Sequence, residues 1–164
     1  MISCTFAGHR DAYEPITESK VRAHLFRLME LDTAFCFYSG GMGRFDLMCE
    51  RLVLETKKLY PQKQIQLLLV LPYMKNSITT HSAYYSKYDE IILPSGLETC
   101  PCKAAILRRN RWMIDRSDYL IAYIHHSLGG AYATLKYARR RSITIWNVAE
   151  PPAVGLNAYP KIWE

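Results

Sequence analysis

The sequence predicts an α/β fold with a doubly wound, mostly parallel sheet of about five or six strands and helices on both faces. Three observations support this prediction. Short apolar segments alternate along the chain with segments whose apolar residues recur at helical spacing. Residues 65–71 are almost continuously apolar, as is typical of a strand covered on both faces. No internal repeat or long linker interrupts the 164 residues. We therefore expect one domain over residues 1–150 and a tail over 151–164 that packs on the domain or on a partner subunit.

The first half of the chain predicts three strands and two helices. The strands are short apolar runs that end at polar residues or at proline: 2–7, 35–38 and 65–71. The helices have apolar residues on one face: Val21, Leu25, Leu28 and Met29 in the first, and Phe45, Met48, Cys49, Leu52 and Leu59 in the second. The second helix follows a glycine-rich turn and ends before Pro61.

The second half continues the alternation. Three further strands are predicted at 91–93, 119–124 and 143–148, and two helices at 103–115 and 129–141. The stretch 73–88 is rich in Tyr, Ser and Thr, fits neither period, and could cover a ligand crevice as a lid. Strands joined by single helices imply right-handed crossovers, so the predicted order is that of a Rossmann-like domain.

Composition excludes several classes of protein. Hydrophobic residues make up 49% of the chain, which is typical of a globular domain. The longest apolar run, 67–72, is much shorter than the roughly 18 residues that cross a bilayer. The sequence does not open with the charged and apolar regions of a secretion signal. We therefore expect a cytoplasmic protein with no membrane partner.

The five cysteines are an odd number, and three of them lie in predicted strands or helices. This pattern favours free thiols in a reducing compartment. Cys100 and Cys102 lack the spacing of a CxxC pair, and no second Cys or His pair complements them at zinc-site spacing. We expect no metal site, and the role of these two thiols stays open.

Three polar or glycine-rich loops follow predicted strands, at 8–14, 39–43 and 127–130. In a doubly wound sheet such loops meet at the carboxyl edge, where ligands bind. The last two loops bring glycine backbone to helix N-termini, whose free N–H groups and positive dipole favour anions. Each loop alone fits a tight turn with a helix cap equally well. Together they predict a site for a phosphorylated ligand.

Side chains near these loops add candidates. Arg10 could pair with a phosphate in a bidentate manner. His9 is a lone loop histidine, most often a surface or hydrogen-bonding residue, and Asp46 could either cap its own helix or accept a hydrogen bond from a ribose hydroxyl. Asn110 falls on the apolar face of its helix, so it either bonds to backbone ends of the sheet or reaches the ligand crevice.

Four segments, TFAGHR, FYSGGMGRFD, LRRNRWMIDRSDYLIAYI and GGAYATLKYA, resemble in this order the SLOG superfamily (SMF/DprA–LOG), in particular its YpsA-like branch. The similarity spans roughly residues 2–148. The resemblance implies a Rossmann-like domain that binds a nucleotide or an ADP-ribose-like ligand at the carboxyl edge of the sheet. With His9 added from its loop position, the candidate binding residues are Gly8, His9, Arg10, Ser39, Gly40, Gly41, Gly43, Asp46, Arg109, Asn110, Gly129, Gly130 and Thr134.

One departure from the superfamily concerns catalysis. The phosphoribohydrolases of the LOG branch carry a PGGxGTxxE motif with a glutamate that serves catalysis. In this sequence no proline precedes Gly129, Ala133 replaces the last glycine and Tyr137 replaces the glutamate. A tyrosine, with a reference pKa of about 10, cannot replace a carboxylate acid/base at neutral pH. Hydrolase activity of that type is therefore not expected from the motif.

Three functions remain open. The first is a sensor or binding module for a nucleotide or an ADP-ribose-like ligand. No cofactor beyond this ligand is expected with certainty. A homodimer is possible if the tail binds a second copy of the chain. The second is an N-glycosidic hydrolase that uses Asp46, Glu14 or Asp115. The third is single-stranded nucleic-acid binding through basic residues, with tyrosines available for stacking: Lys103, Arg108, Arg111 and 136–141, and Tyr84, Tyr85 and Tyr88. The net charge of +6 fits the third, although Arg139, Arg140 and Arg141 also complement a helix C-terminus.

Overall fold

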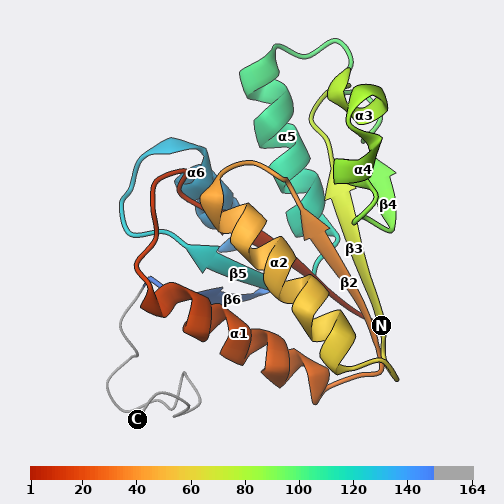
Figure 1. Ribbon diagram of the computed structural model, residues 1–164. Helices are drawn as coiled ribbons and strands as arrows, with labels where there is room; N and C mark the ends of the chain where they lie inside the picture. Colours follow the sequence, from red (N-terminus) through yellow and green to blue (C-terminus); the bar gives the residue numbers. More distant parts are fainter. Residues whose placement is uncertain (150–164) are drawn as a thin grey trace.

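The computed structural model describes residues 1–149, so the predicted tail at 151–164 lies outside the described residues. Six strands form one parallel sheet in the order β4-β3-β2-β1-β5-β6 (Figure 1). Their bounds are β1 Ile2–Gly8, β2 Ala34–Ser39, β3 Gln64–Val70, β4 Glu90–Ile92, β5 Tyr119–Tyr123 and β6 Thr144–Asn147. The chain steps outward from β1 to β4 and then returns to the other side of β1 through β5. The doubly wound parallel sheet is confirmed, and its strand order reverses between β1 and β5.

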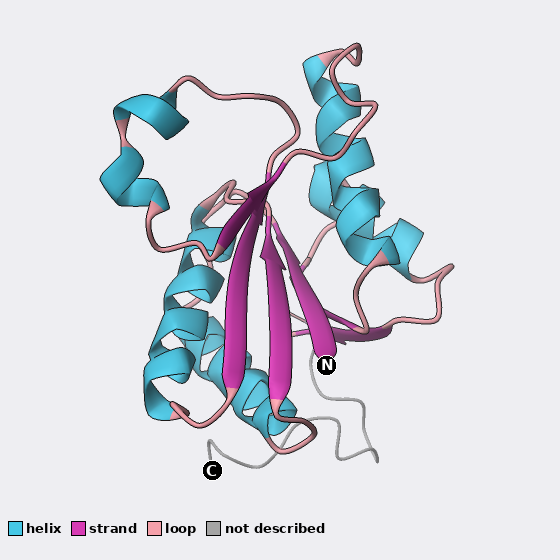
Figure 2. Ribbon diagram, turned by 90° about the vertical axis from the view of Figure 1, so that its right-hand side faces the viewer, coloured by secondary structure: helices cyan, strands magenta, loops and turns pink. Residues whose placement is uncertain are grey.

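Helices cover both faces of the sheet (Figure 2). The long ones are α1 Ile16–Met29, α2 Arg44–Leu59, α5 Cys102–Asp115 and α6 Gly129–Ala138. Helices α1 and α2 pack together on one face, and α5 packs against α6 on the other. None of the helices in the described part of the chain is long and apolar enough to cross a bilayer.

Alternate side chains of the central strands pack into two separate apolar cores, one on each face of the sheet. In β5, Ile121 and Tyr123 join the core on the α1–α2 side, whereas Leu120 and Ala122 join the core beneath α6. Successive side chains of a strand point to opposite faces, so both faces must be covered to bury them. This double burial explains why the strands read as continuous apolar runs. All five cysteines are free thiols.

The stretch 73–88 forms two short helices that the sequence did not predict, α3 Ser77–Thr80 and α4 Ser82–Tyr85. They connect β3 to β4, and the Ser77 hydroxyl lies 2.8 Å from the Tyr85 hydroxyl. Tyr88, which follows the end of α4, is buried in the core on the α1–α2 side. The segment packs on the edge of the sheet, and its residues do not line the main cavity described below. The expectation of a lid over the crevice is therefore wrong for this structure.

Candidate functional site

A cavity of about 410 Å³ lies at the carboxyl ends of β1 and β5, where the strand order reverses. This is the position at which doubly wound sheets bind ligands. Its walls come from the loops after β1 and β5 and from the starts of α2 and α6, with one face of α5. Nine of the candidate residues line it: Gly8, His9, Arg10, Asp46, Arg109, Asn110, Gly129, Gly130 and Thr134.

The start of α6 presents open backbone to this cavity. Leu128, the N-cap residue, is extended and makes no side-chain cap hydrogen bond. Gly129 has a φ of 85°, and a Cβ built on Gly129 or Gly130 would meet nothing within 4 Å. The first N–H groups of a helix have no partner within the helix. Both glycines line the cavity at the positive end of the helix dipole, which is the arrangement that binds anions.

The glycines before α2 are packed against protein. A Cβ on Gly40 would lie 3.0 Å from Cζ of Arg109, and one on Gly41 would lie 2.8 Å from Cδ1 of Leu69. The N–H of Met42 donates to the carboxylate of Asp46 at 3.1 Å. Side chains of this protein therefore occupy the space that the sequence suggested for a phosphate. Ser39, Gly40, Gly41 and Gly43 do not line the cavity.

Ser39 has a structural partner. Its hydroxyl donates to Oε1 of Glu50 at 2.6 Å and accepts the N–H of Gly41 at 3.0 Å. Both Ser39 and Glu50 are buried. Ser39 thus holds the turn before α2 in place, away from the cavity.

Arg109 is buried at 2% exposure and connects two strand ends. Its Nη1 donates to the carbonyls of Gly40 and Val70, and its Nε donates to Oδ1 of Asn110 at 2.8 Å. Its Nη2 contacts the thioether sulfur of Met42 at 3.2 Å, and a thioether is a weak acceptor. Burial lowers the pKa of Arg109 to about 10, which leaves the side chain charged at neutral pH. One donor group of a charged side chain thus remains for a ligand in the cavity.

Asn110 reaches the crevice, which was one of its two predicted roles. Its Nδ2 donates to the hydroxyl of Thr134 at 3.1 Å, and that hydroxyl donates to the carbonyl of Gly130 at 2.9 Å. Since Oδ1 of Asn110 accepts from Arg109, a continuous chain of hydrogen bonds runs from α5 to the first turn of α6. The chain fixes the open amides of α6 relative to the guanidinium.

Asp46 combines the two roles proposed for it. It accepts the N–H of Met42, as a cap does, and it also lines the cavity. Burial raises the pKa of Asp46 to about 7, although the Met42 hydrogen bond and the charge of Arg109 act in the opposite direction. The carboxyl therefore changes its protonation state near neutral pH.

Two other carboxylates lie elsewhere. Glu14 borders a separate cavity of about 260 Å³ beside Lys20 and His125. Asp115 is exposed, accepts from the hydroxyl of Tyr137 at 2.9 Å, and pairs with Arg141 at 3.0 Å. Neither lines the main cavity, so the expectation that they share a site with Asp46 is wrong.

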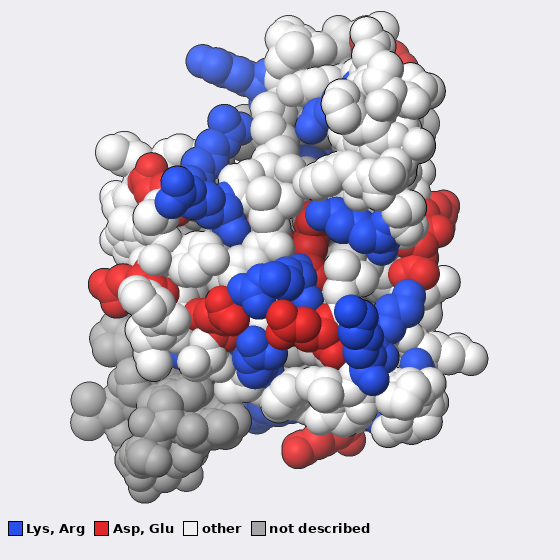
Figure 3. Space-filling view, viewed as in Figure 1, with Lys and Arg blue, Asp and Glu red and all other residues white. Residues whose placement is uncertain are grey.

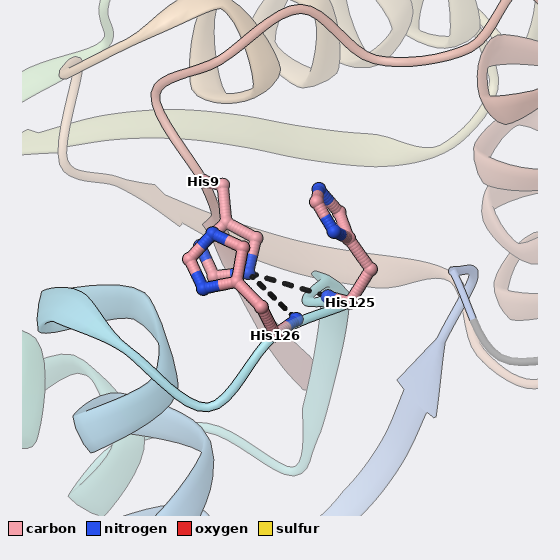
Figure 4. A group of neighbouring side chains, drawn as sticks. All are labelled: His9, His125 and His126. Atoms are coloured by element: carbon pink, nitrogen blue, oxygen red, sulfur yellow. Dashed lines mark hydrogen bonds between the residues drawn. The ribbon is translucent and has the colours of Figure 1, made fainter.

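The loop after β5 supplies histidines that the sequence reasoning did not single out (Figure 4). His125 and His126 lie beside His9, and one ring nitrogen from each of the three histidines lies within 4.8 Å of the others. The rings of His9 and His126 are stacked, with centroids 3.5 Å apart and planes 9° apart. Because metals bind imidazole in the ring plane, two parallel rings do not direct their lone pairs at one ion. Two adjacent histidines directly after a predicted strand were the signal that could have revealed this cluster.

Comparisons with known proteins give a match at the level of structure. No protein-family model and no curated protein matches the sequence. DNA processing protein A (DprA) from Streptococcus pneumoniae matches with a TM-score of 0.62 and 15% identity, over 88% of this chain and 49% of that one. A structure on the single-stranded DNA binding mode of the same protein from Helicobacter pylori matches with a TM-score of 0.62 and 16% identity, over 88% and 63%.

A structural genomics target named TM1055 matches with a TM-score of 0.55 and 13% identity, over 88% of this chain and 72% of that one. The chain spans about half the length of the Streptococcus pneumoniae protein. Identities this low establish similarity of fold alone. The protein has the Rossmann-like α/β fold that also occurs in DNA processing protein A.

Proposed function

We propose that this protein is a SLOG-type binding module for a nucleotide or a nucleotide-derived ligand such as ADP-ribose, held in the cavity between β1 and β5. The observation that carries the proposal is the open start of α6, where Gly129 and Gly130 line the cavity and a Cβ on either would meet no atom within 4 Å. A phosphate there would accept the free N–H groups of the first turn. Arg10, which lines the same cavity and is exposed, would supply a second contact to the phosphate.

The rest of the cavity suits the remainder of such a ligand. Asp46 would accept a sugar hydroxyl, and Nη2 of Arg109 would exchange the sulfur of Met42 for a ligand oxygen. Phe6, Ile106 and Met113 provide apolar wall for a base. A cavity of about 410 Å³ falls within the usual range for small-molecule sites, about 300–1,000 Å³.

The sharpest test places a carboxylate at the anion site. Gly130→Asp puts its side chain into open space in the first turn of α6, where an acidic residue also suits the helix dipole. We expect the variant to fold with an unchanged or higher melting temperature and to lose binding of AMP and ADP-ribose, measured by calorimetry. Ala133→Asp is the matched control, because this exposed α6 position does not line the cavity and should keep binding. Equal binding by wild type and Gly130→Asp would refute the proposed site.

The same samples separate binding from hydrolysis. Release of free base from AMP or NAD would identify an N-glycosidic hydrolase, and Asp46 is the only one of the three candidate carboxylates that lines the cavity. Loss of base release in Asp46→Asn would assign it the acid/base role. Binding without base release supports the binding module.

A second candidate function is single-stranded nucleic-acid binding on the outer face of α5 and α6. Cations lie over aromatic rings there: Arg116 is 4.0 Å from the Trp112 ring centroid and Arg141 is 4.3 Å from that of Tyr137. Tyr88 is not available for stacking, since it is buried and donates to Glu50. The α1–α2 face is unsuited, because positive and negative side chains alternate over it (Figure 3).

Affinity for an oligothymidylate, measured against salt, tests this candidate. Arg116→Ala should weaken binding and reduce the salt dependence if this face contacts phosphates. Arg51→Ala is the control, because Arg51 on α2 already pairs with Glu18 and Glu55. Negligible binding at low salt would eliminate the candidate.

A further inference from the structure

The loop between β5 and α6 is held by imidazole nitrogens. The N–H groups of His125 and His126 both donate to Nε2 of His9, at 3.2 Å and 3.4 Å. The N–H of Leu128 donates to Nδ1 of His126 at 3.3 Å. Three backbone donors within four residues thus rely on two side-chain acceptors. Figure 4 shows the two contacts to His9. Leu128 is the N-cap of α6, so this loop ends where the open amides begin.

These hydrogen bonds define the protonation state of both rings. An imidazole nitrogen that accepts an N–H carries no proton, and the other nitrogen of the neutral ring carries it. His9 is therefore the Nδ1–H tautomer and His126 the Nε2–H tautomer. A proton added to either acceptor nitrogen would place two donors opposite each other and break the contact.

The surroundings of His9 keep it neutral. Its side chain is only 6% exposed, and its backbone N–H donates to the carbonyl of Tyr123 at the end of β5. Burial lowers the pKa of His9, and the neighbouring His126 and His125 lower it further, while Asp11 acts in the opposite direction. Across the cavity, His126 shares the walls with Arg10, Asp46 and Arg109, and His125 borders the second cavity with Glu14 and Lys20.

We propose that His9 and His126 are positioning residues for the anion site: their neutral imidazoles fix the β5–α6 loop and thereby the amides at Gly129 and Gly130. The assignment of an anion to these amides rests on the proposed function, whereas the clamp on the loop does not. The role differs from the direct ligand contact expected of His9. A protonated imidazole beside an anion would normally strengthen binding, so the clamp predicts the opposite sign: anions bind more weakly as pH falls.

The test uses sulfate, whose charge is constant between pH 5.5 and 8, about the range over which histidine titrates. Relative to His9→Gln, in which Asp46 is unchanged, wild-type affinity should fall by about fivefold to tenfold between pH 8 and pH 5.5, as expected for the loss of one or two hydrogen bonds. His9→Gln places an amide oxygen near the position of Nε2 and should lose less sulfate affinity at low pH than wild type, although the contact of Leu128 with His126 is unchanged. His9→Ala should bind weakly at every pH. Tighter sulfate binding at low pH, equal in wild type and His9→Gln, would overturn the proposal.

Hydrogen exchange of the amides of His125 and His126, which both donate to His9, tests the clamp on the loop in the absence of any anion. Protection factors that fall at low pH in wild type but not in His9→Gln support the clamp even if sulfate never binds, in which case the anion site alone fails. Protection factors that change neither with pH nor on substitution of His9 would overturn the clamp. Stoichiometric Zn²⁺ binding at pH 7.5 that disappears in His9→Gln would also overturn it, because a metal would then occupy the acceptor nitrogen.

Discussion

Gly40 and Arg109 lie 69 positions apart in sequence and depend on each other. A guanidinium that is almost fully buried is tolerated only when carbonyl and amide oxygens surround it. Gly40 supplies one of these carbonyls and has no Cβ to displace the guanidinium. At the scale of single residues, the first glycine of the β2–α2 turn therefore serves the packing of an arginine.

Substitution of this glycine tests the dependence. Gly40→Ala would place a methyl group 3.0 Å from Cζ of Arg109, beside carbonyls that hold it. We expect a loss of stability of about 1–3 kcal/mol in urea unfolding, as is usual for overpacking. Gly130→Ala is the control, because its Cβ meets nothing within 4 Å and its stability should be unchanged or slightly higher. Equal stability of both variants would contradict the packing role.

Asp46 should destabilise the fold at alkaline pH. Its folded pKa of about 7 lies above its ordinary value, so its favourable contribution is complete at low pH and is lost as pH rises toward 7. Asp46→Asn keeps an acceptor for Met42 and removes the buried charge. We expect its melting temperature to exceed that of wild type by a few degrees at pH 8 and to match it near pH 4. A gain that is equal at both pH values would rule out this explanation.

At the scale of elements, Glu50 connects α2 to β2 and to the segment before β4. Its Oε1 accepts from Ser39 and from the hydroxyl of Tyr88 at 2.9 Å, and its Oε2 pairs with Lys87 at 2.8 Å. A buried carboxylate needs each of these donors, because an unmet acceptor retains its desolvation cost. The network explains how the α3–α4 connection stays attached to the sheet edge.

Removal of the Tyr88 hydroxyl, one of the donors to Glu50, tests how much this network stabilises the fold. Tyr88→Phe should lower stability by about 1–2 kcal/mol in chemical unfolding, because Oε1 of Glu50 loses a partner. Tyr60→Phe is the control: Tyr60 is half-buried against the same core, and no hydrogen bond of its hydroxyl appears among the described residues. Similar losses in both variants would show that the hydroxyl of Tyr88 has no special role.

At the scale of the whole molecule, buried histidines and a buried aspartate have opposite effects on stability at acid pH. His24 is fully buried against Trp146, and burial lowers its pKa to about 4. His9 is shifted in the same direction. A group with a lowered histidine pKa makes the fold less stable as pH falls below about 6.5, because the unfolded chain binds the proton more readily. Asp46 has the opposite effect over much of this range.

The opposite effects of Asp46 and the two buried histidines predict how the free energy of unfolding depends on pH. In Asp46→Asn the unfolding free energy should rise more steeply from pH 4.5 to pH 6.5 than in wild type, since the opposing contribution of Asp46 is then absent. His24→Phe, which keeps an aromatic ring against Trp146, should flatten the curve. Urea unfolding at half-unit pH steps measures both slopes. Parallel curves for wild type and Asp46→Asn would contradict the assignment.

Much of the fold followed from local patterns. Strand and helix positions were predictable because apolar periodicity and the proline and glycine stops act over a few residues. The expectation for 73–88 failed because α3 and α4 are only four residues each, too short to show a period. Their positions depend on contacts with the core, and such contacts leave no local signature.

The chain by itself determined the order of the elements and the edge at which Gly8, Arg10 and Gly130 meet, because parallel strands always bring their carboxyl ends together. Only the tertiary structure decided which glycines face open space and which face protein. Arg109 fills the turn at Gly40, whereas nothing fills the start of α6. The histidine cluster was likewise decided by a distance between two loops more than a hundred residues apart. Local sequence determines the conformation of a segment, but the neighbours of that segment depend on how the whole chain packs.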